Sequence, residues 1–222
     1  MHLLPHLDGW DPRQQPKLFI GYSDNTSILS WLTTMRRITA LHGPMIDGRL
    51  ARGREGYDPE TFTRLVGGAG AGMVLAPDVL SVLREGSAVS GPLFGGTMTQ
   101  LAASLGTPYA FAPPDGCVLF LEDVNERPYR VDRLFTQLRL AGVLARACAL
   151  VFGEMRGCDE PGGTPGIRAL LLELLDDFTG PVLFGFPSGH TTGPCWSLPL
   201  GVRVTVRTSP GPAVVIEESP VE

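Results

Sequence analysis

A serine in a tight turn is the first residue of this chain with the context for covalent chemistry. Ser23 lies in the tetrapeptide Gly-Tyr-Ser-Asp, between an apolar run over residues 17–21 and a helical pattern over residues 28–38. This is the setting of a nucleophile elbow, which presents the serine hydroxyl above the strand end. The backbone N–H of Asp24 would then stabilise an oxyanion at the helix start. The familiar elbow closes with glycine where this chain has Asn25, so an ordinary helix cap is the alternative.

A serine nucleophile requires a base, and the base requires an acid that orients it. Of the four histidines, His190 stands in a loop framed by glycine and proline, where a rigid scaffold would hold a functional side chain. Glu122 ends the apolar run 118–121, and a buried carboxylate is costly unless it is paired. Its neighbour Asp123 would point to the other face of the strand. We therefore predict a triad of Ser23, Glu122 and His190, with a structural loop histidine and a turn-capping carboxylate pair as the alternatives.

Paired glycines indicate a second part of the site. Gly95 and Gly96 precede Thr97 and a helix expected over residues 98–104. Glycines before a helix let the backbone approach a ligand closely, with free N–H groups facing an anion. We expect this turn to bind the terminal carboxylate of a substrate, and a plain helix-entry turn is the alternative.

The elements that must position these residues alternate between strands and helices, which predicts the α/β class. The Gly-rich stretch 67–72 is the best linker candidate, so we expect two parts, residues 1–75 with the nucleophile and residues 76–222 with the acid and base. Further helices are expected over residues 59–66, 130–141 and 165–178, and strands over residues 39–44, 79–83, 87–93, 117–121, 147–152, 181–186, 202–206 and 213–217.

Composition excludes several classes of protein. The net charge is −5 and no basic run is present, which argues against a nucleic-acid partner. No apolar stretch approaches the roughly 20 residues of a membrane-spanning helix, and the start does not resemble a secretory signal. The four cysteines form no CxxC pair, as in a reduced cytoplasmic protein, and no motif predicts a metal or another cofactor.

Taken together, the segments around Ser23, Gly95, Glu122 and His190 resemble the LD-carboxypeptidase (murein tetrapeptide carboxypeptidase) family, which also contains the microcin C self-immunity peptidases. The resemblance runs through KLFIGYSDNT at 17–26, LHGPM at 41–45, GGTMTQLAASLGTPY at 95–109, LFLEDVNERPYRVDRLFTQL at 119–138, and the Gly-His-Thr and Leu-Pro-Leu-Gly of 185–201. It implies a serine hydrolase with a Ser23–Glu122–His190 triad. It also implies a Rossmann-like N-terminal domain, a mixed α/β C-terminal domain and a site between them.

The family carries a further segment, very roughly 80 residues long, before the region that resembles the start of this chain. We therefore expect residues 1–75 to be a partial Rossmann-like domain, with its exposed apolar surface covered by self-association, for example in a homodimer. We also expect slower hydrolysis than in a longer version, because an oxyanion donor would be missing.

The resemblance implies a cytoplasmic enzyme that takes a small peptide as substrate. Its substrate would be a murein tetrapeptide, which loses its terminal D-Ala during cell-wall recycling. A self-immunity peptidase that cleaves a peptidyl-nucleotide antibiotic is one alternative. A truncated, non-catalytic homologue is the other.

Overall fold

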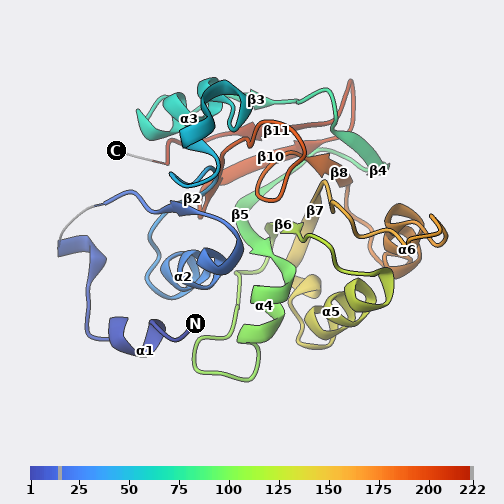
Figure 1. The fold of residues 1–222 in the computed structure, drawn as a ribbon, viewed down its shortest axis with the longest axis horizontal. Helices are drawn as coiled ribbons and strands as arrows, with labels where there is room; N and C mark the ends of the chain where they lie inside the picture. The colour runs from blue at the N-terminus through green and yellow to red at the C-terminus, as the bar shows by residue number, and fades with distance from the viewer. Residues whose placement is uncertain (15–16, 221–222) are drawn as a thin grey trace.

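The apolar runs from residue 74 onward supply one large, curled sheet. The computed structural model describes residues 1–14 and 17–220. Within them the sheet has the strand order β3-β11-β10-β5-β6-β7-β8-β4 (Figure 1). The strands are β3 (Val74–Leu75), β4 (Ser81–Arg84), β5 (Val89–Thr97), β6 (Cys117–Glu122), β7 (Ala147–Gly153), β8 (Val182–Phe186), β10 (Arg203–Arg207) and β11 (Ala213–Ile216). Strands β5 to β8 are parallel, so their carboxyl ends meet at one edge.

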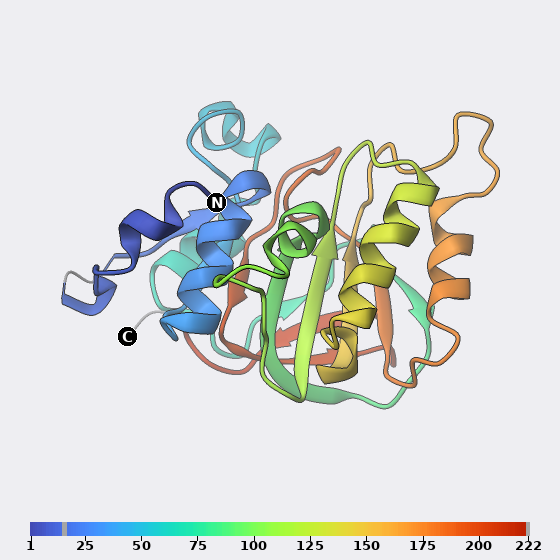
Figure 2. The same ribbon diagram turned by 90° about the horizontal axis from the view of Figure 1, so that it is seen from below.

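Three helices cover one face of the parallel strands (Figure 2). They are α4 (Met98–Ser104), α5 (Pro128–Leu140) and α6 (Ile167–Leu174). Both faces of strand β6 are apolar because each face packs in a core. Leu119 and Leu121 pack in the same core cluster as these helices. Val118 and Phe120 point the other way, into a second core with β10 and β11.

A small sheet carries the first part of the chain. Its order is β1-β2-β9, with β1 (Ile20–Gly21) parallel to β2 (Ala40–His42) and β2 antiparallel to β9 (Leu198–Leu200). The other helices are α1 (Leu4–Leu7), α2 (Thr26–Ser30) and α3 (Pro59–Val66), a π-helix (Trp31–Met35), and 3-10 turns at Pro12–Gln14, Ser23–Asn25, Leu50–Glu55 and Leu144–Arg146. Strand β9 comes from the part of the chain after residue 75 but pairs in the small sheet, and strand β3 comes from the part before residue 76 but pairs in the large sheet. The division into residues 1–75 and 76–222 stays a prediction.

The α/β class is confirmed, and two local expectations are wrong. The helix expected over residues 28–38 forms, as α2 followed by the π-helix to Met35, but the cap expected from Asp24 and Asn25 does not: the Asp24 side chain accepts instead from Gln100 Nε2 at 2.6 Å. Gly95 and Gly96 do not form a turn before a helix, because strand β5 continues through them to Thr97.

No helix among the described residues is long and apolar enough to cross a lipid bilayer.

Candidate active site

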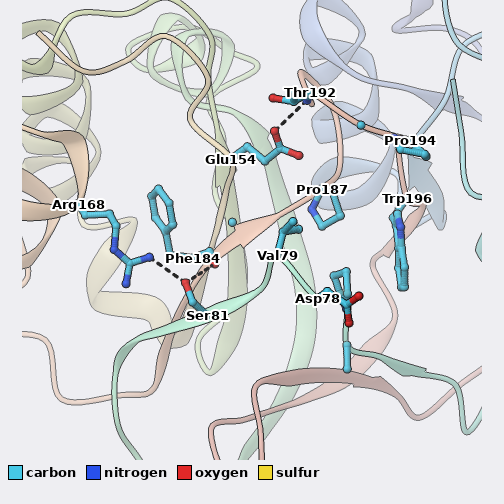
Figure 3. Close-up of a pocket in the computed structure, with 14 residues that line it drawn as sticks. Asp78, Val79, Ser81, Glu154, Arg168, Phe184, Pro187, Thr192, Pro194 and Trp196 are labelled. Carbon is cyan, nitrogen blue, oxygen red and sulfur yellow. Dashed lines mark hydrogen bonds between the residues drawn. The ribbon is translucent and has the colours of Figure 1, made fainter. Parts of the chain in front are cut away.

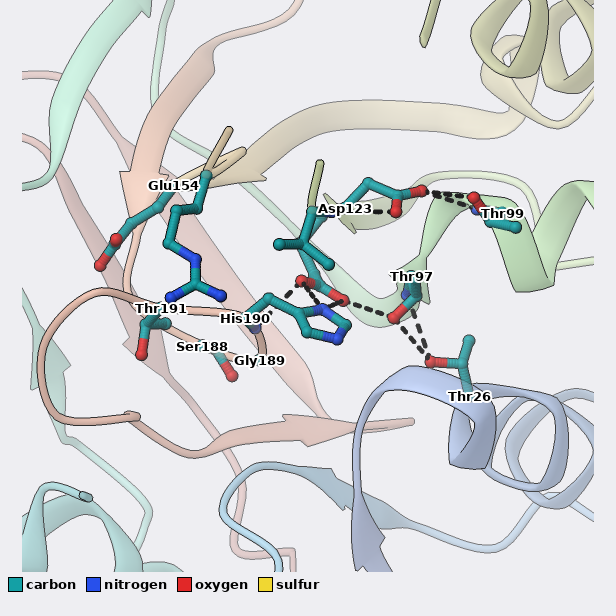
Figure 4. Close-up of polar contacts among 12 residues, drawn as sticks. Thr26, Thr97, Thr99, Asp123, Glu154, Ser188, Gly189, His190 and Thr191 are labelled. Carbon is teal, nitrogen blue, oxygen red and sulfur yellow. Dashed lines mark hydrogen bonds and ion pairs between the residues drawn. The ribbon is translucent and has the colours of Figure 1, made fainter. Parts of the chain in front are cut away.

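Glu122 and His190 meet at the carboxyl edge of the large sheet. Glu122 is the last residue of β6, and His190 lies in the loop that follows β8 (Figure 4). The His190 Nδ1 atom lies 2.9 Å from Oε2 and 3.2 Å from Oε1 of Glu122, and the His190 backbone N–H donates to the same Oε2 at 3.1 Å. Since Nδ1 is engaged, Nε2 is the ring nitrogen left to exchange a proton with a substrate or nucleophile.

The buried Glu122 carboxylate is held in its charged form. Burial alone would raise its pKa, but hydrogen bonding from His190, the nearby His42 and His190 rings and the Thr97 hydroxyl together hold the pKa below its ordinary value. Thr97 Oγ1 makes a short hydrogen bond to Oε1, and Thr26 Oγ1 lies 3.3 Å from Thr97 Oγ1. The carboxylate is therefore fixed to accept a hydrogen bond from the Nδ1–H group of His190.

Ser23 occupies a strained position beside this pair. Its φ of 60° lies in the left-handed region, which is uncommon for a residue other than glycine. The ring of the preceding Tyr22 packs edge-on against His190, 5.1 Å between centroids. On the other side of the turn, Thr26 contacts Thr97. In the described part of the chain no hydrogen bond joins the Ser23 hydroxyl to His190. The structure brings Glu122 and His190 together, and the role of Ser23 as nucleophile stays a prediction.

Asp24 contributes its backbone to the same turn. Its side chain is occupied by Gln100, while its N–H has no hydrogen-bond acceptor among the described residues. That N–H is therefore free for an oxyanion, and its role stays a prediction.

The two adjacent glycines of β5, Gly95 and Gly96, are required by packing. A Cβ on Gly95 would lie 1.9 Å from the carbonyl oxygen of Phe120 in β6, and a Cβ on Gly96 would lie 2.7 Å from Thr26. Thr97 is paired in register with Glu122. Contact of Gly95, Gly96 and Thr97 with a substrate stays a prediction, since the Thr97 hydroxyl serves Glu122.

Sequence reasoning missed two buried residues that contact the His190 loop. His42 Nδ1 lies 2.8 Å from Ser188 Oγ, and its Nε2 is buried without a partner among the described residues. Burial lowers the pKa of His42 to about 4, so the ring is neutral at neutral pH. Arg49 donates to backbone carbonyls of the same loop. Its segment is rich in Gly and Arg and resembles a solvated linker, so no sequence signal marked its burial.

The thiol nearest to the loop is not a competing nucleophile. Cys195 accepts from the Gly189 backbone N–H at 3.4 Å, and burial raises its pKa to about 11. A protonated thiol attacks carbonyl groups poorly. The described residues also contain no group of His, Cys, Asp and Glu side chains that fits a metal ion.

A cavity of about 760 Å³ adjoins the other side of the His190 loop (Figure 3). Thr192 and Pro194 of the loop line it, and Thr192 N–H donates to Glu154 Oε2 at 2.8 Å. Trp196 stands at one end, and Arg168 lies over the Phe184 ring at the other end.

Comparison with protein families decides the relationship. The family profile of the LD-carboxypeptidase C-terminal domain matches residues 90–206, and that of the N-terminal domain matches residues 1–43. This chain belongs to the LD-carboxypeptidase family. The recognition from sequence motifs is thereby confirmed.

Relatives of this chain include both named branches of the family. It is 33% identical to murein tetrapeptide carboxypeptidase of Pseudomonas aeruginosa, over 85% of this chain and 62% of that protein. It superposes on the crystal structure of muramoyltetrapeptide carboxypeptidase from Oxalobacter formigenes with a TM-score of 0.76 and 31% identity, covering 90% of this chain and 68% of the other. With the microcin C7 self-immunity protein MccF in its wild-type apo state, the TM-score is 0.82 at 25% identity, covering 98% and 72%. The chain spans 58%, 61% and 64% of three curated relatives, about three fifths of their length.

Proposed function

We propose that this chain is a serine-type carboxypeptidase with Ser23, His190 and Glu122 as its catalytic triad. The observation that carries the proposal is the Glu122–His190 pair, which leaves Nε2 unoccupied beside the strained Ser23 turn. In this assignment the part of the chain up to residue 75 supplies the nucleophile, and the part from residue 76 supplies the acid and the base.

Each side chain has a defined step. His190 Nε2 removes the proton from Ser23 Oγ as that oxygen attacks the substrate carbonyl, and the Asp24 N–H donates to the oxyanion. His190 then protonates the leaving amine, and the C–N bond breaks to give an acyl-serine. A water activated by His190 hydrolyses this ester and restores the serine. Glu122 remains ionised throughout and stabilises the imidazolium that forms after each proton transfer.

The preferred substrate is a small peptide, a murein tetrapeptide whose terminal D-Ala is released from an L,D-peptide bond. The similarity to murein tetrapeptide carboxypeptidase of Pseudomonas aeruginosa and to muramoyltetrapeptide carboxypeptidase of Oxalobacter formigenes supports this choice. Such a substrate belongs to cytoplasmic recycling of the cell wall, and we place the protein in the cytoplasm on that ground.

The cavity beside the His190 loop favours a second candidate. Trp196 and Phe184 offer aromatic faces for stacking, and Arg168 offers a guanidinium for a phosphate-like group. These groups suit a peptidyl-nucleotide, and solved structures of MccF include a complex with aspartyl sulfamoyl adenosine.

One assay separates these functions. The 222-residue chain is incubated with murein tetrapeptide or with an aspartyl-nucleotide conjugate, and release of D-Ala or of aspartate is measured. We expect D-Ala release that is abolished by Ser23→Ala and retained by Ser30→Ala, a serine of the following helix. Release of aspartate alone would favour the immunity function. Failure to cleave either substrate by a folded protein would favour the non-catalytic homologue.

A further inference from the structure

Arg49 is a buried cation without a carboxylate partner. It is 8% exposed and forms no ion pair with an Asp or Glu within residues 1–14 and 17–220. Burying a guanidinium is unfavourable unless its donors are satisfied. Here the acceptors are three backbone carbonyls of one loop: Nη2 donates to Gly189 O at 3.1 Å and to Thr191 O at 2.9 Å, and Nη1 donates to Gly193 O at 3.1 Å.

Two of these carbonyls flank His190. The Gly189 carbonyl and the His190 N–H belong to the same peptide group, and that N–H donates to Glu122 Oε2 at 3.1 Å. One peptide plane is therefore held between the Arg49 guanidinium at its oxygen and the Glu122 carboxylate at its nitrogen. The peptide dipole is aligned between the two charges, so the ion pair that Arg49 lacks by direct contact is completed through the backbone.

The loop passes so close to Glu122 and His42 that it requires glycine at position 189. Gly189 has φ of +87°, and a Cβ there would lie 2.8 Å from both Glu122 Cδ and His42 Cε1. Figure 4 shows Gly189, His190 and Thr191 in this narrow space. The hydrogen bond that Thr192 N–H donates to Glu154 Oε2 holds the far side of the loop.

We propose that Arg49 is a positioning residue that fixes the Gly189–His190 and Thr191–Thr192 peptide groups and thereby keeps His190 Nδ1 on Glu122. An arginine suits this role because its planar fork reaches several acceptors at once, whereas a lysine is a single point charge. The mechanistic meaning rests on the proposed function, but the effect on His190 geometry does not.

The test compares Arg49→Met and Arg49→Lys with Arg52→Met, which removes an exposed arginine three residues further on. The first readout is the proton NMR signal of the His190 Nδ1–H, which hydrogen bonding to a carboxylate shifts downfield and which a His190→Gln variant identifies. The second is kcat and KM for D-Ala release by the 222-residue chain.

We expect Arg49→Met to lose or broaden the His190 signal and to lower kcat on the order of 10- to 100-fold, because small misplacements of a catalytic group are costly. KM should change less than about threefold, since Arg49 is buried and its guanidinium donates to the loop carbonyls. Arg49→Lys should fall between the two, and Arg52→Met should match the wild type.

An unchanged His190 signal in folded Arg49→Met would overturn the proposal. If that variant does not fold, Arg49→Lys decides, and a wild-type signal and kcat in it would overturn the proposal equally. If the wild-type chain releases no D-Ala, the proposed function fails while the NMR comparison still decides the role of Arg49.

Discussion

At the scale of single residues, the Glu122 carboxylate has the most demanding role. Glu122→Gln keeps the shape of the side chain but removes the charge that stabilises the imidazolium in the proposed mechanism. We expect kcat for D-Ala release to fall by at least about 10²-fold, with little change in KM. Glu126→Gln is a matched control, because Glu126 is partly exposed and pairs with Arg130. Equal activity of the two variants would show that Glu122 is only a structural partner of His190.

His42 predicts how stability depends on pH. Its folded pKa of about 4 lies below the ordinary 6.5, so between these values the unfolded chain binds more protons than the folded chain. Stability should therefore rise with pH across this window, by up to about 3 kcal/mol at 1.4 kcal/mol per pH unit. The depressed pKa of Glu122 adds a loss of stability at lower pH, below its ordinary value near 4.5.

Urea unfolding at pH 4.5, 5.5 and 6.5 measures this dependence. His42→Asn keeps a donor near Ser188 and should flatten the change between pH 4.5 and 6.5. His2→Asn, at an exposed histidine, should behave like the wild type. An equal pH dependence in His42→Asn and the wild type would place the titrating group elsewhere.

At the scale of elements, Gly96 is the residue at which strand β5 packs closely against Thr26 of helix α2. Gly96→Ala places a methyl group against Thr26, whose hydroxyl contacts Thr97 beside Glu122. We expect a loss of stability on the order of 1–3 kcal/mol, from the collision and from a φ of +142°. We also expect lower kcat, because Thr97 would shift.

Gly106→Ala is the control for this prediction. Gly106 also has a positive φ, +79°, but open space where a Cβ would lie. It should lose less stability in thermal unfolding and keep its kcat. If both variants lose the same stability and neither loses activity, the contact between Gly96 and Thr26 does not support the site.

Local sequence patterns predicted the elements whose signals are local. The helix over residues 59–66 matches α3 because Asp58 and Pro59 mark its start, and the apolar run before Glu122 marks strand β6. The prediction of a turn at the paired glycines is wrong because the groups that require glycine there come from other elements: the Phe120 carbonyl for Gly95 and the Thr26 side chain for Gly96. No local signal in the sequence marked the roles of Arg49 and His42, because their hydrogen-bond partners lie more than 130 residues away in the chain.

At the scale of the whole molecule, contacts between the two halves predict one cooperative unfolding transition. Strand β9 completes the small sheet by pairing with β2, and β3 pairs with β11 in the large sheet. Arg49 and Thr61 add hydrogen bonds to the segment between β8 and β9. Unfolding of either half would remove one strand, β3 or β9, from the sheet of the other half, so intermediates should be scarcely populated.

Tryptophan fluorescence can test this, because the three tryptophans report on different regions. Trp10 and Trp31 stack at 6.4 Å in the first part of the chain, and Trp196 lies against Phe186 of β8. A double Trp10→Phe, Trp31→Phe variant leaves Trp196 as the reporter, and Trp196→Phe leaves the stacked pair. We expect each reporter to give the same urea midpoint as the far-ultraviolet circular dichroism of the same variant, whatever stability the substitutions remove.

A lower midpoint for the Trp10–Trp31 reporter than for the circular dichroism of Trp196→Phe would mean that the first part unfolds on its own. In that case the boundary near residue 75 is a true domain boundary, and Ser23 is carried by a unit able to move relative to Glu122 and His190.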